Sequence, residues 1–220
     1  MNKEWSDLNK AMQQLLKKRD TFNEGIAALF RLRDELYNTM LSLREELSRG
    51  DFDAMPYPKA KGYHCKNIAY SMWHIFRIED ITANTLIADR EQVFFTGDYQ
   101  RRINSPIITT GNELSGDEIA SFTKVLDIGA LYEYISDVKQ STEDTVLGMD
   151  FDKLKTKIPT ERREKLISLE VVSRSEDAFW LVDYWCGKDI RGLIQMPFSR
   201  HHIMHTEAML RIRDGLPRRT

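Results

Sequence analysis

Histidine is the residue type whose distribution in this chain points most directly to chemistry. The sequence holds five histidines, His64, His74, His201, His202 and His205, and three of them fall within five residues. Residues four apart on a helix lie one above the other on the same face, so His201 and His205 can direct two imidazole rings to one point. Imidazole is a ligand of zinc, nickel, copper and iron. The spacing therefore predicts two metal ligands on one helix.

The helix face that carries this pair is apolar along its length and is expected to point inward. Its other residues are Ile194, Phe198, Ala208, Met209 and Ile212. His202 lies on a more polar face with Thr206 and Arg213, which makes it the weaker candidate. A spacing of three would nevertheless let His202 and His205 share a metal ion, so the choice between His201 and His202 stays open at this point.

A third ligand has to come from another helix, and His74 is the best candidate. Its helix face includes Tyr70, Ile78 and Ile81, so His74 should also point into the core. His64 follows a glycine-containing loop and could be exposed. A single histidine on an apolar face is more often a hydrogen-bonded core residue than a ligand. Three buried imidazoles without partners would, however, cost several kcal/mol in unmet hydrogen bonds, roughly 1–3 for each, and a metal ion removes that cost.

Three imidazoles are the ligand set of an open metal site, in which substrate or water completes the coordination. Such an ion could lower the pKa of a bound water or position a substrate thiol. We expect one divalent ion, zinc first and nickel second, because the ligand set does not select between them. The alternative is a non-catalytic bundle that uses the metal for stability or partner binding. The HExxH, ExxH, P-loop, GxGxxG and GxSxG motifs are all absent from the sequence.

The elements that must position these residues all have helical periodicity. Apolar residues recur every three or four positions, and no alternating strand pattern is convincing. The helices are expected over 5–48, 64–88, 115–147, 160–169, 175–185 and 198–214, with a helical turn at 187–196 and irregular segments at 51–63 and 89–114. Gly25 marks either a break or a close packing point. The predicted fold is all-α: an antiparallel four-helix bundle in one domain over 1–220, with 1–18 as an accessory N-terminal segment.

Composition narrows the class of partner. Charged residues make up 30% of the 220 residues and the formal net charge is -2, which lacks the basic surface that nucleic-acid binding needs. No apolar run approaches the ~20 residues of a membrane span, and the N-terminus has no signal-peptide pattern. Two cysteines, Cys65 and Cys186, are expected to be free thiols. We therefore expect a cytoplasmic protein with a small-molecule substrate.

Several residues near the expected ligands have two interpretations. Asp80 or Glu79 could orient a ligand histidine, or could form an intrahelical network with Arg77. Tyr70 could line a pocket, or pack in the core like most tyrosines of a bundle. The tryptophans Trp73, Trp180 and Trp185 are expected to be packing residues.

Two segments resemble a known family. Residues 72–80, MWHIFRIED, look like the WHxxRxED element of the DinB-like (DinB/YfiT) metalloenzyme superfamily, and residues 200–205, RHHIMH, look like its second element, HxxxH. The resemblance covers roughly residues 20 to 90 and 115 to 214. It implies a four-helix bundle, often a homodimer, whose divalent metal is bound by His74, His201 and His205. It also implies an S-transferase or isomerase that uses a low-molecular-weight thiol such as bacillithiol, or a stress-response role.

Overall fold

The structure is a computed structural model that describes residues 2–217. These residues form helices and turns, and the pairing of Lys157 with Asp189 is an isolated β-bridge that belongs to no strand in the described part of the chain. No helix within residues 2–217 is long and apolar enough to cross a membrane. The prediction of an all-α fold is confirmed.

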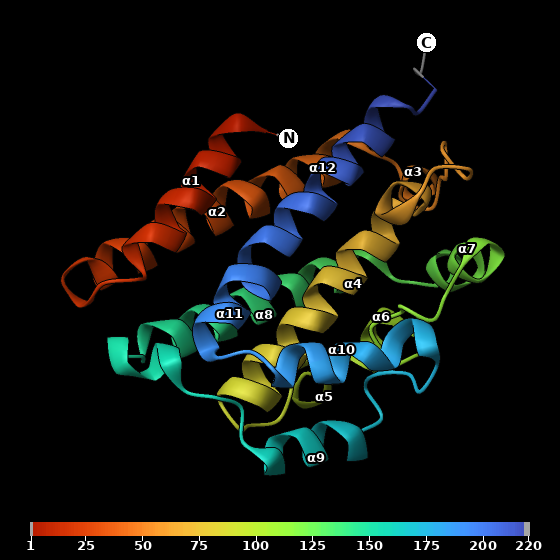
Figure 1. Cartoon of the computed structure of the whole chain (residues 1–220). Helices are drawn as coiled ribbons and strands as arrows, with labels where there is room; N and C mark the ends of the chain where they lie inside the picture. Colours follow the sequence, from red (N-terminus) through yellow and green to blue (C-terminus); the bar gives the residue numbers. More distant parts are fainter. Residues whose placement is uncertain (1, 218–220) are drawn as a thin grey trace.

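Two helices form a hairpin at the N-terminal end (Figure 1). They are α1 (Lys3–Leu15) and α2 (Phe22–Glu46), joined through the 3₁₀ turn η1 (Arg19–Thr21). The single helix expected over 5–48 is therefore wrong, because the Thr21 hydroxyl donates to the Leu15 carbonyl at 2.7 Å and ends the first helix. Gly25 is a close packing point: a Cβ there would lie 2.8 Å from Leu16 Cδ2.

Four helices surround the centre of the molecule (Figure 1). They are α2, α4 (Ile68–Asp80), α8 (Ile128–Leu147) and α12 (His201–Asp214). Contacts join α2 to α8, α8 to α4, α4 to α12 and α12 to α2, so each helix packs against two of the others. Every residue of α4 is buried, including the charged residues Arg77, Glu79 and Asp80.

The ends of these helices follow from local capping. The side chain of Asn67 accepts from the Tyr70 amide at 2.8 Å, so α4 begins at Ile68 rather than at the expected residue 64. It continues into the π-helix η3 (Ile81–Ile87). The single helix expected over 115–147 is also wrong. Asp127 caps a new helix by accepting from the Ala130 amide at 2.9 Å, which separates α8 from α7 (Gly116–Lys124).

The remaining elements are short and connect the longer ones. Segment 89–114, expected to be irregular, contains α5 (Val93–Thr96) and α6 (Tyr99–Ile103) before an irregular stretch. The other short elements are α3 (Arg49–Phe52), η2 (Gly62–Cys65), η4 (Phe151–Lys155), α9 (Thr160–Ser168), α10 (Glu176–Cys186), α11 (Ile190–Gln195) and the π-helix η5 (Met196–Arg200). Here α9 and α10 match the helices expected over 160–169 and 175–185, and η5 leads directly into α12.

Candidate metal centre

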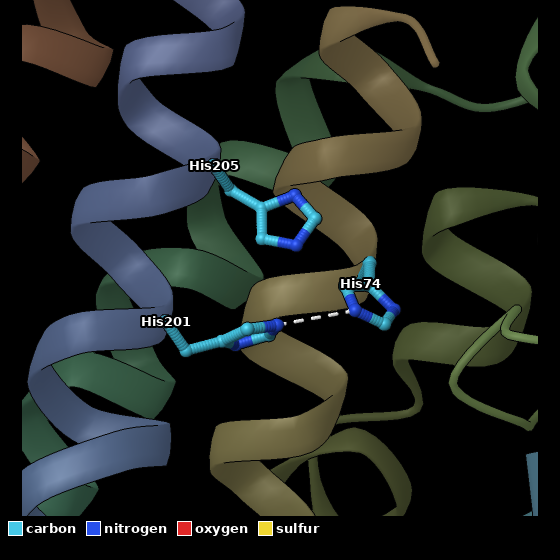
Figure 2. A group of neighbouring side chains, drawn as sticks. All are labelled: His74, His201 and His205. Carbon is cyan, nitrogen blue, oxygen red and sulfur yellow. Dashed lines mark hydrogen bonds between the residues drawn. The ribbon is translucent and has the colours of Figure 1, made fainter. Parts of the chain in front are cut away.

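Three histidines from two helices converge in the interior. His74 comes from α4, and His201 and His205 come from one face of α12 (Figure 2). Each offers a nitrogen such that the three ligand atoms lie within 4.8 Å of one another. The three residues are 5%, 8% and 5% exposed. The structure thus brings together the three residues that the sequence pattern selected.

The irregular stretch before α7 fixes the orientation of His74. Four consecutive carbonyls of this stretch accept hydrogen bonds from side chains of α4. These bonds are Arg77 to Ile108, Trp73 to Thr109, His74 to Thr110 and Tyr70 to Gly111. In the third bond His74 Nδ1 donates to the Thr110 carbonyl at 2.9 Å, which leaves Nε2 without a proton and free to act as a ligand. The Tyr70 ring stacks on the His74 ring with centroids 5.5 Å apart.

Electrostatics keep all three imidazoles neutral. Burial lowers the pKa of His74 to about 4, although the bond to Thr110 opposes the change. Burial also lowers the pKa of His201 and of His205 well below the ordinary value, and the neighbouring histidines lower both further. Because a metal ligand must be an unprotonated nitrogen, the site presents three available lone pairs at neutral pH.

The residues present fit a divalent ion. His201 Nε2 lies 3.2 Å from His74 Nε2, and two imidazole nitrogens about 2.0–2.1 Å from a tetrahedral zinc ion would lie roughly 3.3 Å apart. The Nδ1 atoms of His201 and His205 are buried, and neither has a hydrogen-bond partner among the described residues. Three neutral imidazoles in this arrangement could hold a metal ion and leave coordination positions for other ligands.

A cavity of about 290 Å³ opens onto the three histidines. Apart from them it is lined by Tyr63, Ile78, Asn112, Trp180, Leu181, Tyr184, Trp185, Met196, Pro197 and Met204. Trp185 is 1% exposed, but Trp180 is 51% exposed and Tyr184 36%. The expectation that Trp180 is a packing residue is therefore wrong, because its helix, α10, lies at the surface and turns this side chain toward the cavity mouth.

His202 faces away from this group and contacts a carboxylate. Its Nε2 lies 2.7 Å from Glu79 Oε2, and Glu79 also accepts two hydrogen bonds from Arg33 at 2.7 and 3.0 Å. Burial raises the pKa of Glu79, but Arg33 and then His202 outweigh that effect and lower it to about 2. Glu79 is thus an anion that joins α2, α4 and α12.

Asp80 and Arg77 belong to a separate buried network. The Asp80 carboxylate accepts from the Val93 and Phe94 amides at 2.9 Å each and from Tyr134 at 2.9 Å, and Arg77 donates to it at 3.3 Å. None of these bonds reaches the three histidines. Arg77 and Asp80 thus pair within α4 as that alternative expected, whereas Glu79 pairs with Arg33 and His202 on other helices. Tyr70 contacts the centre by stacking on His74.

Sequence reasoning missed the residues that the irregular stretch contributes. Thr110 holds His74 through its carbonyl, and Asn112 lines the cavity. No motif marks either residue, and Thr110 lies 36 residues along the chain from His74. Cys65 and Cys186 are free thiols, as expected, and His64 is half-buried outside the three-histidine group.

Comparisons with known proteins bear on the fold alone. No protein-family model matches the chain, and no curated protein matches it. Among solved structures, the chain is similar to a conserved protein from Enterococcus faecalis, with a TM-score of 0.57 and 13% identity over 83% of this chain and 91% of that one. At this identity the similarity shows a shared arrangement of helices.

Proposed function

We propose that this protein binds one divalent metal ion, zinc first, through His74, His201 and His205. The observation that carries the proposal is the convergence of three buried, neutral imidazoles on one point. Two of their nitrogens already lie at the separation that a tetrahedral ion requires, at 3.2 Å. An ion held by these nitrogens would also stabilise the fold, because it would bind the folded chain and not the unfolded one.

We further propose that the site is catalytic and acts in thiol S-transfer or in hydrolysis. A divalent ion held by neutral imidazoles lowers the pKa of a water or thiol that it binds, and so supplies a nucleophile at neutral pH. The chain's own residues supply the cavity that admits a substrate, and Thr110 keeps His74 in the tautomer whose Nε2 can bind the metal. Membership of the DinB-like superfamily, which the WHxxRxED and HxxxH elements suggest, is part of this proposal.

The alternative is a metal that only stabilises the bundle. A structural zinc site usually has four protein ligands and is closed to solvent. Here the described residues offer three histidine ligands, and a cavity reaches them. The cavity therefore favours an open site.

Elemental analysis of protein purified without a polyhistidine tag tests the proposal most directly. We expect about one equivalent of metal per chain, lost in His201→Ala and retained in His64→Ala. His64 is the matched control because it is half-buried near α12 but lies outside the group. A thiol-conjugation screen of the loaded protein then tests catalysis. Metal content that is unchanged in His201→Ala would contradict the assignment of the ligands.

A further inference from the structure

The cavity over the three histidines has no charged wall. No Asp, Glu, Lys or Arg occurs among the described residues that line it, whose polar members are Tyr63, Asn112, Tyr184 and the three histidines. A charged group placed against such a wall would lose its hydration without gaining a partner. The wall therefore selects a ligand whose body is uncharged. The volume of about 290 Å³ lies at the lower end of the range for small-molecule sites, so the ligand is small.

Two aromatic side chains stand at the cavity mouth. Trp180 and Tyr184 lie one turn apart on α10, with ring centroids 5.6 Å apart at an interplanar angle of 66°. The other tryptophans, Trp5, Trp73 and Trp185, are at most 5% exposed, whereas Trp180 is 51% exposed. Its indole donates to the Asp177 carbonyl at 3.0 Å, which holds the ring in place without a ligand. A fixed and exposed aromatic pair offers an edge and a face to another aromatic ring.

Asn112 gives the cavity a hydrogen-bond donor with a defined orientation. Its side-chain oxygen accepts from the Thr110 hydroxyl at 2.8 Å, so its NH₂ group is the free end of the amide. That group has no hydrogen-bond partner among the described residues, and Asn112 lines the cavity. The backbone of the same Thr110 holds His74. One residue thus positions both a proposed metal ligand and a donor suited to a ligand oxygen.

We propose that this cavity binds a small, uncharged aromatic molecule that carries a carbonyl-type oxygen. Its ring packs against Trp180 and Tyr184, and its oxygen accepts from Asn112. This molecule would be the substrate of the proposed metal site. Only the placement of its reacting end at the histidines rests on the proposed function. The wall and the donor belong to the protein itself, so binding does not require the metal.

Ligand-detected NMR titration of the full chain tests the proposal, in zinc-loaded and in metal-free form. The probe is benzamide, for which we expect a Kd on the order of 1 mM, given so few atoms. Two comparison probes each change one property: benzoate adds a charge, and cyclohexanecarboxamide removes the aromatic ring. In the metal-free protein both should bind at least about threefold more weakly than benzamide, from the lost ring contact or the unpaired charge.

Two variants locate the bound molecule. Trp180→Leu and Asn112→Ala should each weaken benzamide binding by about 2- to 12-fold, from the usual contribution of one aromatic contact or one hydrogen bond. Leu147→Ala is the matched control, because Leu147 is 64% exposed and does not line the cavity. Since Trp180 and Leu147 are exposed, both variants should fold, and their melting temperatures check this.

Several results would overturn the proposal. They are the absence of benzamide binding in both forms, equal binding of the three probes by metal-free protein, or unchanged affinity in Trp180→Leu. A fall in molecular mass from dimer to monomer in Trp180→Leu, with benzamide affinity unchanged, would instead assign the aromatic pair to a protein contact. Benzamide binding by a protein that takes up no metal would support this inference while refuting the proposed function.

Discussion

Replacing Arg33 with methionine tests whether the ion network beside the candidate centre holds its helices together. Arg33 lies on α2 and is 3% exposed, and it donates to Glu79 at 2.7 Å and to Glu143 at 3.1 Å. The substitution keeps much of the volume but leaves the Glu79 carboxylate, whose side chain is 0% exposed, with His202 as its remaining partner. Breaking a buried ion pair from one side costs about 3–5 kcal/mol.

The pKa of Glu79 reports how strongly all of its surroundings together favour the carboxylate. Burial raises this pKa, but Arg33 and His202 lower it to about 2, from an ordinary value of 4.5. The difference corresponds to roughly 3 kcal/mol of stability. Because the pKa is lower in the folded state, this stability is complete above pH 4.5 and is lost as the pH falls toward 2. A loss of about 3–5 kcal/mol in Arg33→Met would be a large part of a total stability of about 5–15 kcal/mol.

Urea unfolding at pH 7 and thermal unfolding measure this effect. We expect a lower urea midpoint and a melting temperature lower by about 6–20 °C, at about 2–4 °C for each kcal/mol in a chain of this size. Arg31→Met is the matched control on the same helix. Arg31 pairs with Glu35, but its side chain is 72% exposed, so the loss there should be about 0–1 kcal/mol.

The reasoning would be refuted if both variants lost the same stability. A second variant separates charge from packing. In Arg33→Met combined with Glu79→Leu, no buried charge is left unpaired, and much of the lost stability should return. If the double variant is no more stable than Arg33→Met, the loss arises from packing and the uncompensated carboxylate does not matter.

Three further predictions follow from the described contacts. Folding lowers the pKa of His74 from 6.5 to about 4, so its contribution to stability is complete above pH 6.5. Metal-free protein should lose up to about 3 kcal/mol of stability as the pH falls to 4. Urea midpoints that stay constant between pH 7 and pH 4.5 would contradict this. Gly25→Ala places a Cβ 2.8 Å from Leu16 Cδ2, and urea unfolding should show a loss of about 1 kcal/mol of stability after the gain in helix propensity is subtracted. Gly50→Ala is the control and should lose no stability, because its Cβ meets no atom within 4 Å. Asp80→Asn should lower the stability measured by urea unfolding by at least about 2 kcal/mol, because it disrupts charged hydrogen bonds. The folded variant should still bind one equivalent of metal. Loss of metal from the folded variant would show that Asp80 contributes to the metal site.

The sequence was sufficient for the parts of this molecule that depend on helical periodicity. The spacing of His201 and His205 defines a shared face whatever surrounds the helix. The apolar residues on that face, including Ala208, Met209 and Ile212, are all buried. The polarity of the two faces favoured His201 over His202 without deciding between them, and it did not predict that His202 is also buried.

The parts that the sequence could not provide depend on contacts between distant residues. The helix expected over 5–48 is divided in two by the hydrogen bond from the Thr21 hydroxyl to the Leu15 carbonyl. Periodicity alone does not predict this bond. The irregular stretch before α7 is ordered by four side chains of α4 that no local pattern connects to it. Arg33 looks like an ordinary charged residue of an amphipathic helix, and its partner Glu79 lies 46 residues away.

The two neighbouring histidines of α12, His201 and His202, differ in what faces them. This difference explains why one can be a metal ligand while the other contacts a buried carboxylate. His201 faces His74 and His205, which are neutral, so a divalent ion is the partner that would satisfy this group. His202 faces Glu79, a carboxylate that could itself bind a metal ion. Arg33 already occupies both oxygens of Glu79 and so keeps that carboxylate from competing for the ion. The sequence HHxxH is compatible with a metal on either face, and because Arg33 of α2 pairs with Glu79, the proposed ion would bind on the face with the cavity.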